Sequence, residues 1–218
     1  MAEEHVLVVQ RKIVEDIGAF HGLCFDVDAY LAALFAPGVP RFIPRSAAEN
    51  DPDYKQLIPY VIMTHAGRYL TYVRGKRAGE TRLVGNRSIG IGGHINPIDD
   101  MPLLGDFGHT YLEAVRREVA EETTVAAAHT DHIVALLNDD SNDVGKVHLG
   151  IVHLWTLQNA DVRRREQMIT KMTFMTADEL RAVRGEMETW SQIFLDGLDQ
   201  MAQRAAAAPP AESLFTNH

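Results

Sequence analysis

Three glutamates on one short segment constrain this chain more than any other feature. Residues 117–122 have the sequence REVAEE, so Glu118, Glu121 and Glu122 follow Arg117 at spacings of i, i+3 and i+4 among themselves. On an α-helix these spacings project side chains to one side. Because unpaired carboxylates repel each other, a fold is expected to avoid this cluster unless a cation neutralises it. The alternative is a solvated acidic helix face.

The residues around this segment predict a helix with a buried face. Leu112, Val115 and Val119 recur at helical spacing and should face the core. The glutamates then fall on the adjacent flank, at the rim of the buried face, where a cleft can form. Thr110 and Glu113 fit the S/T-x-x-E pattern and predict a capping box that starts this helix at Thr110. Carboxylate oxygens at the rim suit Mg²⁺, Mn²⁺ or Ca²⁺ better than Zn²⁺.

Composition excludes several classes of function. The chain has 218 residues, 46% of them hydrophobic, and a formal charge of −9. This acidic balance disfavours general nucleic-acid binding but is compatible with a small phosphorylated ligand. Cys24 is the single cysteine, so no intrachain disulfide can form. No signal peptide or membrane span is evident, and we expect a cytoplasmic protein.

Runs of apolar and β-branched residues predict a β-rich chain with a few helices. Strands are expected at 6–10, 60–64, 69–74, 88–95, 132–137, 147–157 and 169–174, with short helices at 13–20 and 28–35 and loops at 41–53 and 96–108. A second capping box at Thr176 and Glu179 predicts a helix that runs to about Arg204. Together these elements predict an α/β (α+β) sandwich with a mixed β-sheet.

The domain organisation follows from the same pattern. Residues 1–55 are interpreted as an N-terminal extension that packs on a main domain at 56–205, and residues 206–218 as a flexible tail. Within the main domain, residues 88–95 have the sequence SIGIGGHI. Isoleucines two apart between glycines predict a strand whose backbone must approach another group closely.

These motifs together resemble the Nudix box, written G-x5-E-x7-R-E-U-x-E-E-x-G-U. REVAEE matches its core, Val125 fits the closing aliphatic position, and Gly92 and Gly93 resemble the opening glycines. The resemblance covers about residues 58–185, with its specific part at 88–125. It implies a Nudix-like α/β/α sandwich.

The chain departs from the box at three positions. The opening glycine of the pattern falls at Leu103, so the loop between strand and helix carries an insertion. The first glutamate of the pattern falls at His109, which we interpret as a loop residue. The glycine near the helix end is Thr124, and a β-branched residue resists the left-handed conformation of a glycine C-cap. The helix is therefore expected to end differently here.

The resemblance implies a divalent-metal-dependent hydrolase of a phosphoanhydride bond in a nucleoside diphosphate linked to another moiety. Mg²⁺ or Mn²⁺ would be held by Glu118, Glu121 and Glu122, one of which can instead serve as general base, and by the carbonyl of Gly93. Arg117 would orient a glutamate; an i, i+4 ion pair with Glu113 is the alternative. Metal bound there would neutralise the diphosphate and activate water for attack.

Two further groups of charged residues are candidates for the site. Arg74 and Arg87 are predicted to hold substrate phosphates, although they belong to a basic segment that can also be simply solvated. Asp139, Asp140 and Asp143 lie in the loop before a predicted strand and can supply a further ligand or base. A solvated turn is the alternative for these three acids.

The sequence leaves other classes of function open. A non-catalytic Nudix-like nucleotide sensor or interaction module is one, supported by the missing box glutamate at His109. An isomerase that resembles isopentenyl diphosphate isomerase is another, but that chemistry needs a cysteine in the middle of the domain, and Cys24 lies elsewhere. Dimers are frequent in the resembled family, so a homodimer is also open.

Overall fold

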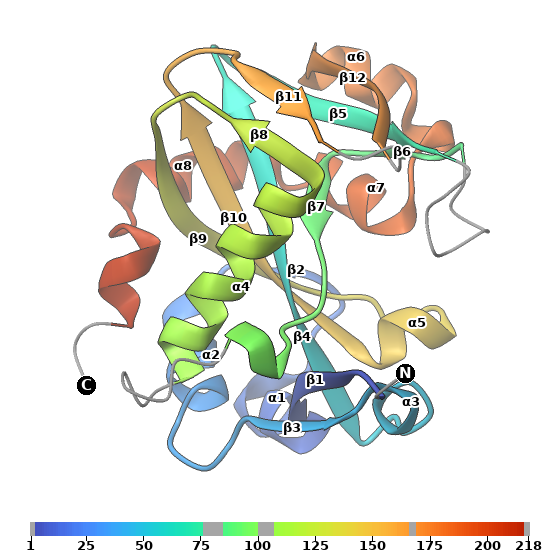
Figure 1. Cartoon of the computed structure of the whole chain (residues 1–218), viewed down its shortest axis with the longest axis vertical. Helices are drawn as coiled ribbons and strands as arrows, with labels where there is room; N and C mark the ends of the chain where they lie inside the picture. Colours follow the sequence, from blue (N-terminus) through green and yellow to red (C-terminus); the bar gives the residue numbers. More distant parts are fainter. Residues whose placement is uncertain (1–2, 76–84, 100–106, 166–168, 216–218) are drawn as a thin grey trace.

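One large mixed β-sheet organises the chain, shown by a computed structural model that describes residues 3–75, 85–99, 107–165 and 169–215 (Figure 1). Its central path, with each strand beside the next, is β12 (Ile169–Thr176), β5 (Arg68–Arg74), β4 (Tyr54–His65), β10 (His148–Leu157), β9 (His129–Asn138) and β2 (Gly22–Cys24). β4 and β10 run parallel, whereas β10 and β9 run antiparallel. The predicted mixed sheet is therefore confirmed.

The long strand β4 anchors the shorter strands that form the site. β1 (His5–Gln10) pairs antiparallel with the start of β4, and β7 (Gly90–Gly92) pairs with its middle. β6 (Arg87–Ser88) pairs with β5. β3 (Arg41–Pro44) pairs with β1 and is followed by α3 (Arg45–Ala48). The loop predicted at 41–53 is therefore wrong, because Ile43 pairs opposite the buried Val6.

Helix α4 (Phe107–Glu122) lies across one face of the sheet and carries the acidic motif (Figure 1). Leu112, Val115 and Val119 are buried, as their spacing predicts. The helix begins three residues before Thr110, so the predicted capping box is wrong, and Thr110 is a fully buried residue inside the helix. His109 is likewise helical and not in a loop. The chain passes directly from the helix into β8 (Thr123–Val125), which pairs with β11 (Val162–Arg164).

The opposite face of the sheet is covered by α6 (Ala177–Ala182), α7 (Thr189–Leu195) and α8 (Leu198–Ala207) (Figure 1). Their buried side chains pack with those of β4, β9 and β10 in a second core. The capping box of Thr176 and Glu179 is present. The single helix predicted to reach about Arg204 is wrong, because a 3-10 turn at Arg184–Glu186 and Gly197 before α8 divide it.

The ends of the chain are more ordered than the sequence suggests. Helices α1 (Arg11–Gly18) and α2 (Val27–Leu34) accompany β1 and β2 within the first 55 residues. After α8, a 3-10 turn at Ala211–Leu214 brings Phe215 against Tyr111 and Gly108 of α4. The expected frayed tail is therefore wrong as far as Phe215. No helix in the described part of the chain is long and apolar enough to cross a membrane.

A buried lysine joins the start of β4 to the loop that precedes β10. Lys55 is fully buried, and its Nζ donates to Asn138 Oδ1 at 2.7 Å, Asp140 Oδ1 at 2.8 Å and the Gly145 carbonyl at 2.9 Å. Arg11 adds a second ion pair to Asp140 at 3.2 Å. Burial lowers the pKa of Lys55 to about 8, although Asp140 acts in the opposite direction. The network joins α5 (Asp143–Lys146) and α1 to the sheet.

This depressed pKa predicts an unusual pH dependence of stability. Between about pH 8 and the ordinary lysine value of 10.5, the unfolded chain holds a proton that folded Lys55 has released. The free energy of unfolding should therefore rise with pH in this window, by at most roughly 1.4 kcal/mol per unit. Urea unfolding from pH 7 to 10 measures it. Lys55→Met should lack this rise and should lower stability at pH 7 by about 3 kcal/mol, because its partners lose a buried donor. Equal pH profiles for both proteins would refute the assignment.

Candidate functional site

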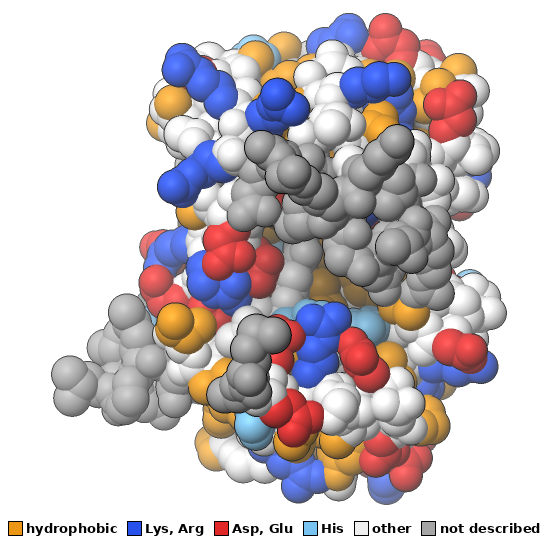
Figure 2. All heavy atoms as spheres, turned by 45° about the vertical axis from the view of Figure 1, so that its right-hand side comes forward, with side chains coloured by type: hydrophobic (Ala, Val, Ile, Leu, Met, Phe, Trp, Pro, Cys, Tyr) orange, Lys and Arg blue, Asp and Glu red, His pale blue; other side chains and the backbone are white. Residues whose placement is uncertain are grey.

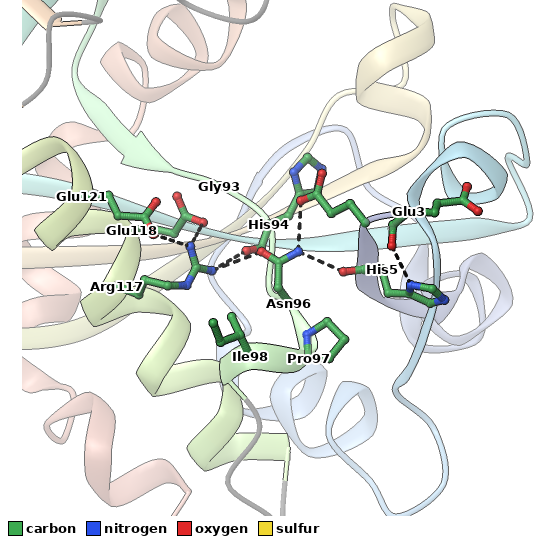
Figure 3. A pocket seen from close by; sticks show the side chains of 11 residues that line it. Glu3, His5, Gly93, His94, Asn96, Pro97, Ile98, Arg117, Glu118 and Glu121 are labelled. Carbon is green, nitrogen blue, oxygen red and sulfur yellow. Dashed lines mark hydrogen bonds and ion pairs between the residues drawn. The ribbon is translucent and has the colours of Figure 1, made fainter. Parts of the chain in front are cut away.

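A cavity of about 620 Å³ lies between α4, the start of β1 and the segment that follows β7 (Figure 3). On the face shown in Figure 2, acidic, basic and histidine side chains surround a hollow in the middle of the molecule. The cavity is lined by Glu3, Glu4, His5, Gly93, His94, Asn96, Pro97, Ile98, Arg117, Glu118 and Glu121. It therefore brings two of the three motif glutamates together with the second glycine of the Gly-Gly pair.

The glycines of the segment 88–95 allow the close approach that the sequence predicts. A Cβ on Gly90 would lie 1.8 Å from the ring of Tyr60. A Cβ on Gly93 would lie 2.1 Å from Oε2 of Glu118, so this carboxylate rests directly against the Gly93 backbone. Any larger residue at position 93 would have to displace Glu118.

Arg117 is the centre of the polar contacts in the site (Figure 3). Its guanidinium binds Asp99 through two hydrogen bonds of 2.6 and 2.9 Å. It also donates to Glu118 at 2.7 Å and to Glu121 at 3.2 Å. Arg117 therefore contacts two of the three motif glutamates, and its role in orienting them stays a prediction. The alternative pair with Glu113 does not form, because Arg116 takes that partner.

Arg117 also holds the backbone of the segment after β7. Its Nη2 donates to the His94 carbonyl at 2.9 Å. Asn96 links the same segment to β1, since its side-chain amide donates to Glu4 Oε1 at 3.0 Å and to the His5 carbonyl at 2.9 Å. The N-terminal strand and the acidic helix are thus joined through one short loop.

The acidic wall of the cavity, formed by Glu118 and Glu121, is unfavourable for the ionised form of Glu118. Burial raises the pKa of Glu118, Arg117 opposes this rise, and the neighbouring carboxylates of Glu121 and Asp99 add to it. On the far side, burial together with Arg45 and His148 lowers the pKa of His94 to about 3. His94 is therefore neutral near pH 7 and adds no positive charge to the cavity.

Glu122 is placed differently from the other two glutamates. It does not line the cavity, and it is half-buried at the end of α4. Burial raises the pKa of Tyr72 in β5, Arg74 opposes this rise, and the negative charge of Glu122 adds to it. The role of Glu122 as a metal ligand stays a prediction.

The residues at the cavity fit a hard divalent cation in donor chemistry. Glu118 and Glu121 offer only oxygen donors, which Mg²⁺ and Mn²⁺ prefer. A cation would also relieve the energetic burden of ionised Glu118 beside Glu121 and Asp99. Within the described ranges, no three His, Cys, Asp or Glu side chains are gathered as a ready-made metal cluster. Arg117 donates to both glutamates instead.

The other predicted site residues lie outside this cavity. Arg74 forms an ion pair of 2.9 Å with the buried Glu188, and Arg87 reaches Thr71 at 3.5 Å. Asp140 binds Lys55 and Arg11. Buried Asp139 accepts hydrogen bonds from Ser141 and Asn142, and exposed Asp143 pairs with Lys146. These contacts support roles in structure, and the substrate-binding role of Arg74 and Arg87 stays a prediction.

Sequence reasoning missed several residues of the cavity. Asp99 lies in the inserted loop and has no sequence motif of its own, yet it is buried and binds Arg117. Glu4, His5 and Asn96 carried no signal, because their neighbours in space are distant in sequence.

Comparison with solved structures defines the class of protein. Tm1382, described as a proposed Nudix hydrolase, matches with a TM-score of 0.74 and 28% identity over 89% of this chain and 98% of that chain. The NUDIX domain of NrtR from Shewanella oneidensis, solved with ADP ribose, matches with a TM-score of 0.50 and 14% identity over 69% of this chain and 88% of that one. With the acidic motif on α4 and Gly93 against Glu118, the chain belongs to the Nudix superfamily.

A curated sequence relative extends over nearly the whole chain. Protein YmaB of Bacillus subtilis (strain 168) is 33% identical over 208 residues, which cover 90% of this chain and 98% of that protein. No family model matches the sequence. The similarity to YmaB thus extends over most of the chain and is not confined to one motif.

The Arg117–Asp99 ion pair should contribute strongly to stability. Asp99→Asn is expected to lower the free energy of unfolding by about 2–4 kcal/mol, because it leaves a half-buried guanidinium without its bidentate partner. Asp196→Asn is a matched control. Its pair with Arg184 has the same distances, 2.6 and 2.9 Å, but is exposed, so the effect should stay below about 1 kcal/mol. Denaturant unfolding measures both, and equal effects would refute the special role of Asp99.

Proposed function

We propose that this chain is a divalent-metal-dependent hydrolase that cleaves a phosphoanhydride bond in a nucleoside diphosphate linked to another moiety. The observation that carries the proposal is the Glu118 carboxylate seated against Gly93 with Glu121 on the same cavity wall. This is where the Nudix resemblance places the metal ligands. The NrtR domain bound to ADP ribose makes that compound a rational first probe.

The residues of the cavity would have different roles in such a reaction. Mg²⁺ or Mn²⁺ held by Glu118 and Glu121 would supply the positive charge that a diphosphate needs before water can attack it. Arg117 keeps the two carboxylates at fixed positions through its hydrogen bonds to both. Asp99 fixes Arg117 in turn, so the acids are preorganised before substrate binds.

A non-catalytic nucleotide sensor is the second candidate. Glu122 lies away from the cavity, and His109 stands at the position of the first glutamate of the box. A binding module would keep the cavity and would not need a full set of ligands. Binding of ADP ribose without any hydrolysis would favour this candidate.

Metal dependence gives the direct test of the hydrolase. Phosphoanhydride cleavage of ADP ribose and related nucleoside diphosphate derivatives should require Mg²⁺ or Mn²⁺ and should stop when EDTA removes the metal. Glu118→Gln is expected to lower kcat/KM by roughly 100-fold or more. The variant would lose a ligand of the metal that neutralises the negative charge of the diphosphate. Glu113→Gln, on the same helix but paired with Arg116, is the control and should keep most activity. Undiminished turnover by the Glu118 variant would exclude this site.

Gly93 provides a test that separates position from charge. Gly93→Ala should displace the Glu118 carboxylate, because the new Cβ would overlap it at 2.1 Å. Since a flexible side chain can move away, the free energy of unfolding should change by no more than about 1 kcal/mol. Activity should nevertheless fall about 10-fold or more. Gly185→Ala is the control, because nothing lies within 4 Å of its Cβ. A fully active Gly93 variant would contradict the assigned geometry.

A further inference from the structure

Two histidines from different strands meet beside the cavity. His94 comes directly after the Gly-Gly pair, and His148 is the first residue of β10. Their Nε2 atoms lie 3.4 Å apart, and both residues are half-buried. His94 also lines the cavity, between the Arg117 end and the His5 end (Figure 3). The cavity therefore gives an ion a path to this pair.

The distance between the two nitrogens fits a shared metal ion better than a hydrogen bond. Protein N–H donors usually lie about 2.7–3.2 Å from an acceptor oxygen, and 3.4 Å between two nitrogens is at the long end for such a contact. Zinc binds histidine nitrogens at about 2.0–2.1 Å, so two ligands of a tetrahedral ion are about 3.3–3.4 Å apart. The pair thus has the separation that such an ion requires.

The backbone holds His148 in the orientation that a ligand needs. Its Nδ1 lies 2.6 Å from the carbonyl oxygen of Val144, which can only accept a hydrogen bond. The proton of the neutral ring is therefore on Nδ1, and Nε2 presents its lone pair toward His94. A histidine that binds a metal usually donates its other ring nitrogen in this way.

A buried amide next to His148 has no partner among the described residues. Gln56 is fully buried in β4, and neither its side-chain nitrogen nor its side-chain oxygen has a hydrogen-bond partner. Gln56 is aligned with His148 in the parallel pairing of β4 and β10, so both side chains stand on the same face of the sheet. An unpaired buried amide is costly, and a water bound to a metal ion is a group that can satisfy it.

The charges around the pair are compatible with a cation. The carboxylate of Glu4 and the guanidinium groups of Arg45 and Arg117 act on His94. Each of these arginines is already paired with two carboxylates. Neither arginine therefore presents an uncompensated positive charge to the histidines.

We propose that His94 and His148 bind a transition-metal ion, Zn²⁺ in the first place, at a site separate from the acidic wall. Imidazole nitrogens suit Zn²⁺, whereas Glu118 and Glu121 offer the oxygen donors that Mg²⁺ and Mn²⁺ prefer. With two histidines and water as ligands, the ion should exchange more readily than in a site with four protein ligands. It would join the segment that carries Gly93 to β10. This inference does not depend on the proposed hydrolase activity.

Uptake of Zn²⁺ in the presence of excess Mg²⁺ tests the proposal, because Mg²⁺ occupies the carboxylates and leaves the histidines. Equilibrium dialysis of the full chain should give about one zinc per chain. His94→Gln and His148→Gln should each weaken Zn²⁺ binding at least about 10-fold, since the loss of a ligand costs at least as much as the loss of its supporting contact. His21→Gln is the control, because this exposed histidine lies outside the cavity and should not affect binding.

X-ray absorption at the zinc edge gives a second readout that needs no histidine variant. The spectrum of the wild-type protein should show two imidazole ligands, with oxygen in the remaining positions. Glu118→Gln should leave both the spectrum and the uptake unchanged, because Glu118 belongs to the other site. A spectrum with fewer than two imidazoles would overturn the proposal even if a histidine variant failed to fold.

The other outcomes are equally decisive. If the wild-type protein takes up no Zn²⁺ beside excess Mg²⁺, or if His148→Gln binds it as tightly as the wild type does, the two rings form only a hydrogen-bonded pair. If Glu118→Gln abolishes uptake, the ion lies at the acidic wall and the proposed site is wrong. Zinc uptake by the histidines without any phosphoanhydride hydrolysis would overturn the proposed function and leave this site standing.

Discussion

The bidentate ion pair between Arg117 and Asp99 is the contact on which the site depends. It joins the acidic helix to the segment after β7, with both partners largely withdrawn from solvent. Without a cation between them, Glu118 and Glu121 would repel each other at the mouth of the same cavity. Arg117 supplies that cation from within the motif itself. Asp99 then determines where the guanidinium, and therefore both carboxylates, can lie.

The N-terminal strand is part of the site and not an addition to it. β1 is fixed on β4 by backbone pairing, and Leu7 donates to the Ile95 carbonyl at 3.0 Å. Asn96 then bridges from Glu4 and His5 toward Arg117, whose Nη2 lies 3.4 Å from its side-chain oxygen. A shift of β1 would therefore change the position of Arg117 and of the glutamates that it binds. This arrangement explains how residues far from the motif in sequence come to line the same cavity.

The sequence predicts the parts of this fold that rest on local periodicity. Leu112, Val115 and Val119 are buried because a helix repeats its face every 3.6 residues, whatever surrounds it. The predicted start of that helix at Thr110 was wrong, since the S/T-x-x-E pattern also occurs inside helices. Here Phe215 packs on Gly108 and supports an earlier first turn. No local pattern reveals a contact between residues about a hundred positions apart.

The candidate site likewise contains residues that a local sequence pattern predicts and residues that it does not. The glutamate spacing and the glycines carry the Nudix resemblance, and that resemblance implies that Gly93 and Glu118 belong to one site; Gly93 does lie against Glu118. Asp99 and Glu4 have no such signature: an isolated acid becomes specific only when folding brings an arginine or an asparagine to it. The contribution of the insertion and of the N-terminal extension to the site therefore could not be predicted from the sequence.

Helical geometry explains why the three glutamates separate. At about 100° per residue, Glu121 lies roughly 60° to one side of Glu118 and Glu122 roughly 40° to the other. A cavity on one flank can therefore receive Glu118 and Glu121 while Glu122 does not line it. Glu118 lies between the other two glutamates and is pressed against Gly93, so we expect it to hold any cation that binds at this cavity.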